Sequence, residues 1–502
     1  MPVLAVLLFA VAFPQSECKR CHAKETAAFA QTGMGRSLGT PGAVPDGAFT
    51  HEPSGTKFEI RSTAAGLQQS FTRGQESASY PVAYAIGSGN HAFGYLVRIG
   101  DHLFQSPLSY YTQRRLWDVA PGYEQAGAPD FSRPVTPECL SCHSGHARPV
   151  ANTLNRYQNP PFESETISCD RCHGPVEAHL QRPVPGSILN PARLPAAARD
   201  SVCEQCHLAG EIRIPNPGHS LSDFVPGEPA EDVFTVYVGG NANQGLKVIS
   251  HSEQLALSRC ARSSGGKLWC GTCHDPHAPA RATHADYRER CLACHAATLS
   301  AAHAAPTQDC VTCHMPRLPA RDGGHTVFTD HRIARNPSIP PLPETAGLRA
   351  WREPPAAFRE RNLALALATH GLENGISDEA VRGFKLLSRM EPQLSTDAAA
   401  LTALGSILLT AKEAKEAEKR FARALALRPE YAPYEVNLAN ALLESGDRAG
   451  AIEHLNHALA LDPLLEQAAE SLARAYRSQG EAEKAEQVLQ NYRTAMGITV
   501  RK

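Results

Sequence analysis

A five-residue pattern, Cys-x-x-Cys-His, recurs seven times along this 502-residue chain and constrains its fold more than any other feature. The seven copies use 14 of the 15 cysteines, two in each copy. Chance alone, given this composition, would supply on the order of 0.02 copies of the spacing known for haem attachment. The cysteines are Cys18, Cys21, Cys139, Cys142, Cys169, Cys172, Cys203, Cys206, Cys270, Cys273, Cys291, Cys294, Cys310 and Cys313. The histidines that complete the copies are His22, His143, His173, His207, His274, His295 and His314.

The chemistry of a covalent haem explains this spacing. Two thiols three positions apart on a helical turn reach the two vinyl groups of one haem, and the adjacent histidine then lies under the iron as its proximal ligand. A zinc site built on Cys-x-x-Cys needs no histidine directly after the second cysteine, and a disulfide framework needs none either. The sequence therefore predicts seven covalent haem c groups. Their apolar surface also explains how a chain with only 6% aromatic residues fills its core.

Each iron that only transfers electrons usually carries a second axial side chain, histidine or methionine. Twelve histidines lie outside the motifs before residue 340, so seven irons have enough candidates. For each of them a surface or hydrogen-bonded role is an equal alternative. The distal candidates, chosen for their position near a motif, in a glycine-rich segment or in a strand-like segment, are His51, His91, His179, His277, His303, His325 and His331.

Met34 competes with histidine for the first iron. Methionine ligation would raise the reduction potential of that haem relative to bis-histidine neighbours. Methionine also fills irregular gaps in apolar cores, which is an equally good interpretation of Met34. Cys260 is the one cysteine outside the motifs, and a buried thiol, an intermolecular disulfide and an unusual haem ligand all remain open for it.

The spacing of the motifs predicts how the haems group. Successive first cysteines are 121, 30, 34, 67, 21 and 19 residues apart. Short gaps leave room for little beyond the motif helix, so we expect haems two to four, and haems five to seven, to lie close together. The long first gap contains the alternating segments KFEIRS and GYLVRIGDHLFQSPLSYY, and Gly100-Asp101 marks a hairpin turn. Residues 45–125 are therefore predicted to form a small β-rich insertion.

The N-terminal residues MPVLAVLLFAVAF form an apolar run too short to span a bilayer. The run resembles the core of a secretory signal, with Ala10-Val11-Ala12 as the cleavage site, although no Lys or Arg precedes it. A buried N-terminal strand is the alternative. We expect residues 1–15 to be signal-like and the mature chain to be exported, periplasmic or extracellular, without a membrane span. The balance of 49 basic against 51 acidic residues argues against a nucleic-acid binder.

Beyond a linker predicted at residues 341–360, the chain repeats itself every 34 residues. Leu404-Gly405, Ala417 and Pro429 recur as Leu438-Ala439, Ala451 and Pro463, and weaker copies lie on either side. This period and the placement of small residues are those of tetratricopeptide repeats, stacked pairs of helices. About four repeats are expected over residues 361–497, with an ordinary helical bundle as the alternative. Such repeats dock other proteins or cap the domain beside them.

Several stretches resemble a known group of proteins. CHGPVEAH, TCHDPH, DCVTCHMP, HTVFTDHRI and IGSGNHAFGYL are similar to segments of exported multihaem c-type cytochromes fused to tetratricopeptide repeats, related to the cytochrome c554 and doubled-CxxCH families. The resemblance covers most of residues 16–335 and implies haem binding and electron transfer outside the cytoplasmic membrane. In related haem domains the position of Met34 is often histidine.

The expected fold is mainly α, with a heptahaem cytochrome domain of few strands over residues 16–340 and an α-solenoid after it. The expected function is electron transfer through seven haems, with the repeats docking a redox partner such as another cytochrome or a membrane-bound oxidoreductase. The alternative is a multihaem reductase that acts on a small nitrogen or sulfur compound at one open iron. None of the motifs replaces the proximal histidine by lysine, and no catalytic constellation is evident, so the sequence favours the carrier.

Overall fold

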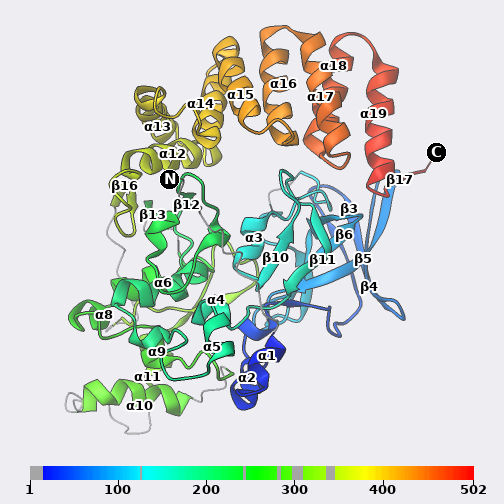
Figure 1. Cartoon of the computed structure of the whole chain (residues 1–502). Coiled ribbons are helices and arrows are strands. Elements are labelled where there is room, and N and C mark those ends of the chain that lie inside the picture. The colour runs from blue at the N-terminus through cyan, green and yellow to red at the C-terminus, as the bar shows by residue number, and fades with distance from the viewer. Residues whose placement is uncertain are drawn as a thin grey trace.

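The computed structural model describes residues 15–124, 127–240, 245–279, 284–296, 309–334 and 345–501. Figure 1 shows a β-sheet region in blue, a region of short helices in green, and an arch of paired helices in yellow to red. Residues 1–14, most of the signal-like segment, lie outside the described residues. Among the described helices, none combines the length and apolar character needed to cross a membrane.

The largest sheet is an antiparallel meander of six strands extended by two short ones. The six strands are β2 (Gly47–His51), β3 (Thr56–Thr63), β4 (Gly66–Arg73), β5 (Glu76–Ile86), β6 (Gly94–Ile99) and β7 (His102–Gln105). The strands β1 (Leu38–Gly39) and β17 (Thr499–Val500) both pair with β5. The sheet is therefore more substantial than the small insertion expected, because it recruits strands from outside residues 45–125.

Buried and exposed residues alternate along the strands of this sheet, and the buried ones form its core. In β3, Phe58 and Ile60 are buried while their neighbours in sequence point to solvent, as a period of two requires. Phe58 lies opposite Phe71 of β4. The same core includes Tyr492 and Met496 from the end of the chain. Each such large apolar side chain stabilises the fold by roughly 1.5–3 kcal/mol when it is fully buried.

Short helices carry the seven motifs. The motif helices are α1 (Gln15–Lys19), α3 (Pro137–Ser141), α4 (Asp170–His173), α6 (Ala196–His207), α9 (Cys270–Cys273), α10 (His284–His295) and α11 (Cys310–His314). Between them lie the short helices α2 (Ala23–Phe29), α5 (Glu177–Gln181), α7 (His251–Leu257) and α8 (Arg259–Ser263). Few of these helices exceed two turns, so their positions depend on packing rather than on helix propensity.

Small antiparallel ladders connect the motif helices. The strand pairs are β8 (Leu108–Tyr111) with β9 (Leu116–Val119), β10 (His146–Pro149) with β11 (Tyr157–Ser164), and β14 (Arg317–Pro319) with β15 (Val327–Thr329). A three-stranded sheet joins β12 (Ile212–Pro215), β13 (Phe234–Gly240) and β16 (Thr345–Ala350). Strand β16 falls inside the segment expected to be a linker. The residue after it, Trp351, donates a 3.1 Å hydrogen bond to Glu204 beside the fourth motif, which holds this segment against the motif region.

The C-terminal part is a solenoid of four consecutive helix pairs. The helices are α12 (Arg359–Glu373), α13 (Ser377–Met390), α14 (Ala398–Thr410), α15 (Ala414–Leu427), α16 (Ala432–Ser445), α17 (Arg448–Leu461), α18 (Glu466–Ser478) and α19 (Ala482–Ala495). Small residues lie where the two helices of a pair cross. At the crossing of α14 and α15, for example, a Cβ added at Gly405 would come within 2.6 Å of the Phe421 ring. Pro429 and Pro463 follow the ends of α15 and α17, as expected for residues that cannot continue a helix.

Both ends of the solenoid are fastened to the rest of the chain. At its start, Asn362 of α12 is fully buried and donates to Asn216 and Thr235 beside β12 and β13, at 2.7 and 2.9 Å. At its end, β17 pairs with β5, and Tyr80 donates a 2.9 Å hydrogen bond to the carbonyl of Met496. The arch in Figure 1 therefore spans from the motif region to the large sheet.

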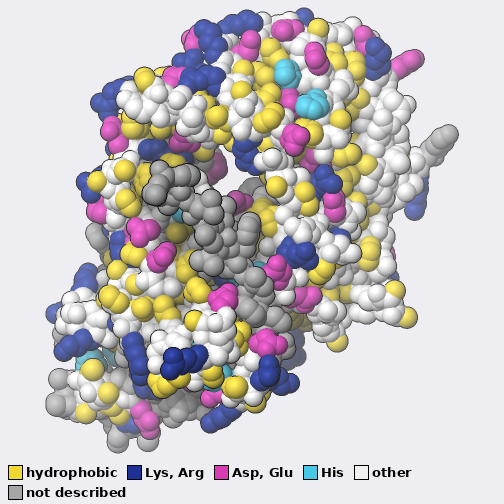
Figure 2. All heavy atoms as spheres, viewed as in Figure 1, with side chains coloured by type: hydrophobic (Ala, Val, Ile, Leu, Met, Phe, Trp, Pro, Cys, Tyr) yellow, Lys and Arg dark blue, Asp and Glu magenta, His cyan; other side chains and the backbone are white. Residues whose placement is uncertain are grey.

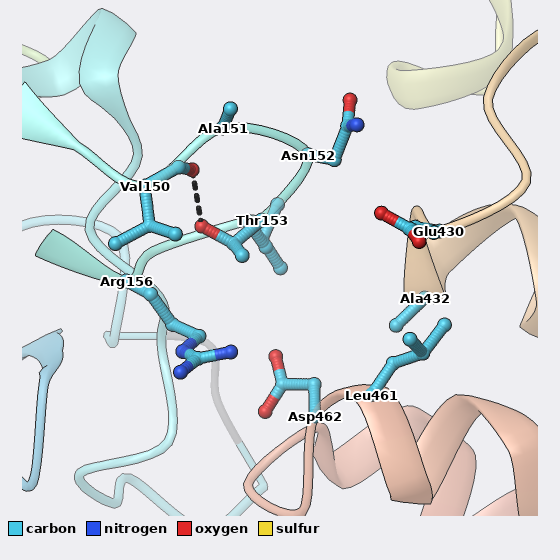
Figure 3. A pocket seen from close by; sticks show the side chains of 10 residues that line it. Val150, Ala151, Asn152, Thr153, Arg156, Glu430, Ala432, Leu461 and Asp462 are labelled. Atoms are coloured by element: carbon cyan, nitrogen blue, oxygen red, sulfur yellow. Dashed lines mark hydrogen bonds between the residues drawn. The ribbon is translucent and has the colours of Figure 1, made fainter.

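Between its two ends the solenoid also contacts the part of the chain below it. His102 of β7 lies between Asp101 and Asp462, with its ring nitrogens 2.9 and 3.0 Å from the two carboxylates. A pocket of about 160 Å³ adjoins this contact, between the loop at residues 150–156 and the solenoid residues Glu430, Ala432 and Leu461 (Figure 3). Figure 2 shows the surface hollowed between the arch and the part below it.

Candidate haem sites

The motif cysteines present thiols that are free to form thioethers. All fifteen cysteines of the chain lie within the described residues, and none is in a disulfide. The structure therefore does not contain the disulfide framework that is the alternative explanation for so many cysteines. The motifs fold as helical turns. In the third motif, for example, the backbone N–H of His173 donates a 2.9 Å hydrogen bond to the carbonyl of Cys169.

Histidine rings from distant segments face the motif histidines at one recurring distance. Two imidazoles that bind opposite sides of one iron, each through a bond of about 2 Å, have ring centroids roughly 6 Å apart. Four motif histidines have such a neighbour: His22 with His179 at 6.2 Å, His173 with His277 at 5.8 Å, His207 with His251 at 5.5 Å, and His274 with His331 at 6.2 Å. These pairs have the spacing that a shared iron requires.

Hydrogen bonds orient several of these rings. The Nδ1 atoms of three histidines lie 2.8–2.9 Å from backbone carbonyl oxygens: His173 from Leu189, His314 from Ala334 and His331 from Thr329. A carbonyl oxygen can only accept, so each Nδ1 carries the proton and donates it. The lone pair of each imidazole is then on Nε2, which is the usual arrangement for a histidine that binds a metal.

The rings of His207, His251, His274 and His331 form one cluster, in which His251 and His331 are partly buried. His251 contacts His331 at 4.9 Å between centroids, in addition to its 5.5 Å contact with His207. Burial, followed by the repulsion from His331 and the other imidazoles, lowers the pKa of His251 to about 3. The ring is therefore neutral at physiological pH, and the neutral ring is the form that binds a metal.

Thiols from different motifs are direct neighbours. Four inter-motif pairs of cysteine side chains interact: Cys18 with Cys169, Cys142 with Cys206, Cys203 with Cys270, and Cys291 with Cys310. The first motif thus lies beside the third, although 151 residues separate their first cysteines. The fourth motif lies beside both the second and the fifth. Short sequence gaps indicate some of these contacts, but not the one made by the first motif.

Cys260 precedes the fifth motif in the sequence and lies near thiols of the fifth and sixth motifs in space. Burial raises the pKa of the Cys273 and Cys291 thiols, and the neighbouring Cys260 thiol adds to both shifts. Its own side chain is partly buried on the short helix α8. The structure thus places this cysteine inside the motif region rather than on a remote surface.

Other predicted distal candidates have different surroundings. His51 is buried at the end of β2, where its Nδ1 lies 2.8 Å from the Ser54 hydroxyl. The Nε2 of His325 lies 2.7 Å from the carboxylate of Asp118, and the ring meets Tyr111 edge-on. The structure therefore brings neither histidine into one of the four ring pairs.

His91 and Met34 lie in their expected segments without a paired motif histidine among the described residues. The His91 ring stacks on Phe328 with centroids 4.1 Å apart, and its Nδ1 lies 2.8 Å from the side-chain amide of Gln113. Met34 begins a single 3₁₀ turn at Met34–Arg36. His303, the remaining candidate, lies outside the described residues.

His251 is the pairing histidine that sequence reasoning did not single out. It is one of the twelve histidines outside the motifs, but it begins α7 in a segment, HSEQLALSRC, that has no feature of a ligand loop. The nearest motif in sequence is 19 residues away, from His251 to Cys270. Its role as a neighbour of His207 depends on tertiary packing, so no local signal in the sequence could identify it.

Comparison with known proteins identifies two segments. Residues 122–174 match the family model described as cytochrome c554 and c-prime, and this span includes the second and third motifs. Residues 436–463, which cover most of α16 and α17, match a tetratricopeptide repeat model. No curated protein matches the chain.

Several solved structures are similar to a part of this chain. Crystal structures of MamA are 22% identical, cover 28% of this chain and 80% or 74% of their own, and have TM-scores of 0.25. A structure described as a kinesin light chain with nearly identical TPR-like repeats, from Podospora anserina, is 21% identical, covers 28% of this chain and 75% of its own, and also has a TM-score of 0.25. The repeat model and the stacked helix pairs confirm a C-terminal region of tetratricopeptide type.

Proposed function

We propose that this chain is an exported multihaem c-type cytochrome that carries electrons through seven covalent haems. The observation that supports this best is the coincidence of two independent patterns. Seven motifs have the spacing for haem attachment, and four of their histidines face a second histidine at the separation of two axial ligands. The match of residues 122–174 to the cytochrome c554 family supports haem c as the cofactor.

The ring pairs suggest specific second ligands. We assign His179 to the first haem, His277 to the third, His251 to the fourth and His331 to the fifth, each opposite its motif histidine. For the second, sixth and seventh haems the candidates remain His51, His91, His303 and His325. The assignment of His179 to the first haem leaves Met34, the competing candidate for that iron, without this role. A haem with two axial side chains exchanges electrons without binding substrate, which is the chemistry of a carrier.

The contacts between motifs define a route for electrons. Interacting thiols join the first motif to the third, the fourth to the second and fifth, and the sixth to the seventh. Cys172 is close enough to raise the pKa of Cys203, and Cys273 that of Cys291, although burial and nearer thiols contribute more to both shifts. These electrostatic influences indicate that the third motif lies near the fourth and the fifth near the sixth. The seven haems would then form one continuous row with the second as a branch.

The solenoid is proposed to dock the redox partner. Tetratricopeptide repeats generally present a curved surface to another protein. Part of the solenoid surface already contacts the sheet and the motif region of the same chain, at Asp462 and Glu466 for example. The partner, another cytochrome or a membrane-bound oxidoreductase, would therefore bind the part of the solenoid that faces away from these contacts.

The haem content tests the proposal directly. We expect intact-mass spectrometry of protein matured in an export-competent host to show seven haems per chain. Substituting the motif cysteines Cys270 and Cys273 by alanine is expected to remove one haem and leave six. A wild-type chain with the mass of bare polypeptide would overturn the proposal.

The alternative, a reductase with one open iron, makes a different spectroscopic prediction. Electron paramagnetic resonance of the oxidised carrier should show low-spin ferric haems alone. A high-spin haem whose signal changes on addition of nitrite or hydroxylamine would instead support the enzyme. Measuring this with the fully loaded chain keeps the result separate from incomplete maturation.

A further inference from the structure

Two hairpins from distant parts of the chain meet beside the seventh motif. The β8–β9 hairpin carries Gln113 in its turn, and the β14–β15 hairpin begins three residues after His314. The backbone N–H of Val327 donates a 3.1 Å hydrogen bond to the Gln113 side-chain oxygen, and the Gln113 amide group lies 3.4 Å from the Val327 carbonyl. The pair of contacts fixes which end of the Gln113 amide is oxygen and which is nitrogen.

A second contact locks the hairpins together. The ring of His325 lies 2.7 Å from the carboxylate of Asp118 and packs edge-on against Tyr111. Gly324 lies so close to Tyr111 that an added Cβ would come within 2.2 Å of the phenol oxygen. The two hairpins therefore have a defined relative position, and what lies between them is a feature of the fold.

Between the hairpins lies a pocket of about 360 Å³, lined by Gln113, Arg114, Arg317 and Val327. This volume is at the lower end of the range for small-ligand sites. Arg114 and Arg317 come one from each hairpin, and both side chains are exposed to solvent. A ligand can thus reach both guanidinium groups without any rearrangement of the backbone.

The positive charge of this pocket is not balanced within the described part of the chain. Neither Arg114 nor Arg317 forms an ion pair or a side-chain hydrogen bond with a described residue. Nearby arginines differ in this respect, since Arg332 binds Asp330 at 2.7 Å. The carboxylate of Asp118, on the same hairpin as Arg114, is engaged with His325. Two planar guanidinium groups without a carboxylate partner suit a ligand with several negatively charged oxygens.

We infer that this pocket binds a small inorganic oxyanion between the guanidinium groups of Arg114 and Arg317. The side-chain amide of Gln113 adds a donor on the wall of the pocket and connects it to His91, whose Nδ1 lies 2.8 Å away. An anion here would lie beside the segment that carries the seventh motif. The inference concerns these residues alone and does not depend on the number of haems.

Calorimetry on the full-length, haem-loaded protein tests the inference, with sulfate and inorganic phosphate as probes at constant ionic strength. We expect saturable binding of one anion per chain. Losing one charge-assisted contact should weaken that affinity about tenfold or more, in Arg114→Gln and independently in Arg317→Gln. Arg115→Gln is the matched control, because it removes the same charge from the same turn without lining the pocket. Its affinity should stay within a factor of about two of the wild type.

Three outcomes would overturn the inference. The first is that the wild-type protein shows no saturable binding of either probe. The second is that Arg115→Gln weakens binding as much as the two pocket variants, which would indicate a general effect of surface charge. The third is that both pocket variants shift the reduction potential of one haem in buffer without either probe anion, which would mean that the arginines pair with haem propionates. Haem content is measured for every variant, because its loss would count against the proposed cytochrome function and not against this pocket.

Discussion

His251 contacts two other histidine rings, His207 and His331, at centroid distances of 5.5 and 4.9 Å. The Nδ1 atom of His251 is buried and has no hydrogen-bond partner among the described residues. Buried polar atoms of this kind are costly. Coordination of an iron by this Nδ1 would give the atom a partner, whereas coordination through Nε2 would leave it without one.

Replacing His251 by alanine should expose one iron. We expect His251→Ala to convert one low-spin ferric haem to high spin in electron paramagnetic resonance of the oxidised protein, with the total haem content unchanged. His219→Ala is the control, because His219 is an exposed histidine 3.9 Å from Asp223 and has no ring neighbour among the described residues. If the low-spin signals of His251→Ala remain complete, the assignment of the fourth haem is wrong.

Glu466 titrates differently in the folded and unfolded chain. The Ser132 hydroxyl oxygen lies 2.6 Å from this carboxylate and 2.6 Å from that of Asp130, and its single proton can be donated to only one of them at a time. Burial, reinforced by the charge of Asp130, raises the pKa of Glu466 to about 7, against an ordinary value of 4.5. The folded state therefore holds this proton more tightly than the unfolded chain. The free energy of unfolding should accordingly fall as the pH rises from about 4.5 to 7.

Urea denaturation at pH 5 and pH 8 measures this effect. Between these values the wild type should lose on the order of 2 kcal/mol of stability through Glu466. Glu466→Gln should lose correspondingly less. Glu483→Gln, an exposed substitution on the next helix, α19, should behave like the wild type. Equal pH dependence in all three proteins would contradict the assignment to Glu466.

Helices α12 and α13 cross so closely that Gly383 has no room for a side chain. A Cβ at this position would lie 2.4 Å from the backbone nitrogen of Ala368. The helices must separate to accept even a methyl group, so Gly383→Ala should destabilise the solenoid by about 1–3 kcal/mol. Lys385→Ala, an exposed change on the same helix, is the control. Thermal unfolding followed by circular dichroism distinguishes the two, and an unchanged midpoint for Gly383→Ala would contradict the crossing geometry.

The elements that repeat in sequence could be predicted, and those that depend on distant partners could not. The motifs and the 34-residue period are local regularities, and Gly405 and Ala417 lie at helix crossings as that period predicts. Strand β16 was missed because its hydrogen bonds go to β13, more than a hundred residues earlier. Two-residue β17 has no local signature and exists because β5 offers a free edge. The pairing of His207 with His251 could not be predicted either, because it also depends on residues that are distant in sequence.

The whole molecule depends on the solenoid for part of its core. Tyr492 and Met496 pack against the sheet that contains Phe71 and Tyr80. Removing the repeats would therefore uncover apolar surface on that sheet, in addition to removing any docking surface. Deletion alone cannot separate a loss of partner binding from a loss of folding.

Truncation before α12 should reveal this dependence. We expect a chain that ends at residue 358 to show faster amide hydrogen exchange in β4 and β5 than the full chain, because these strands lose the packing of α19 and the pairing with β17. The motif helices α9 and α11 provide the internal control, since they are not part of that core. Unchanged exchange in β5 would show that the sheet folds independently of the repeats.

One end of the solenoid is bonded to the sheet of β12 and β13, and its other end pairs with β5. The curvature of the solenoid and the distance between those two sheets can therefore change only together. Any protein that flattens or tightens the superhelix when it binds must pull those sheets apart or press them together. Glu204, inside the fourth motif, accepts a hydrogen bond from Trp351, which directly follows β16 of the β12–β13 sheet, so such strain would act on the fourth motif. Binding at the repeats and the position of this motif would then be linked by the same deformation.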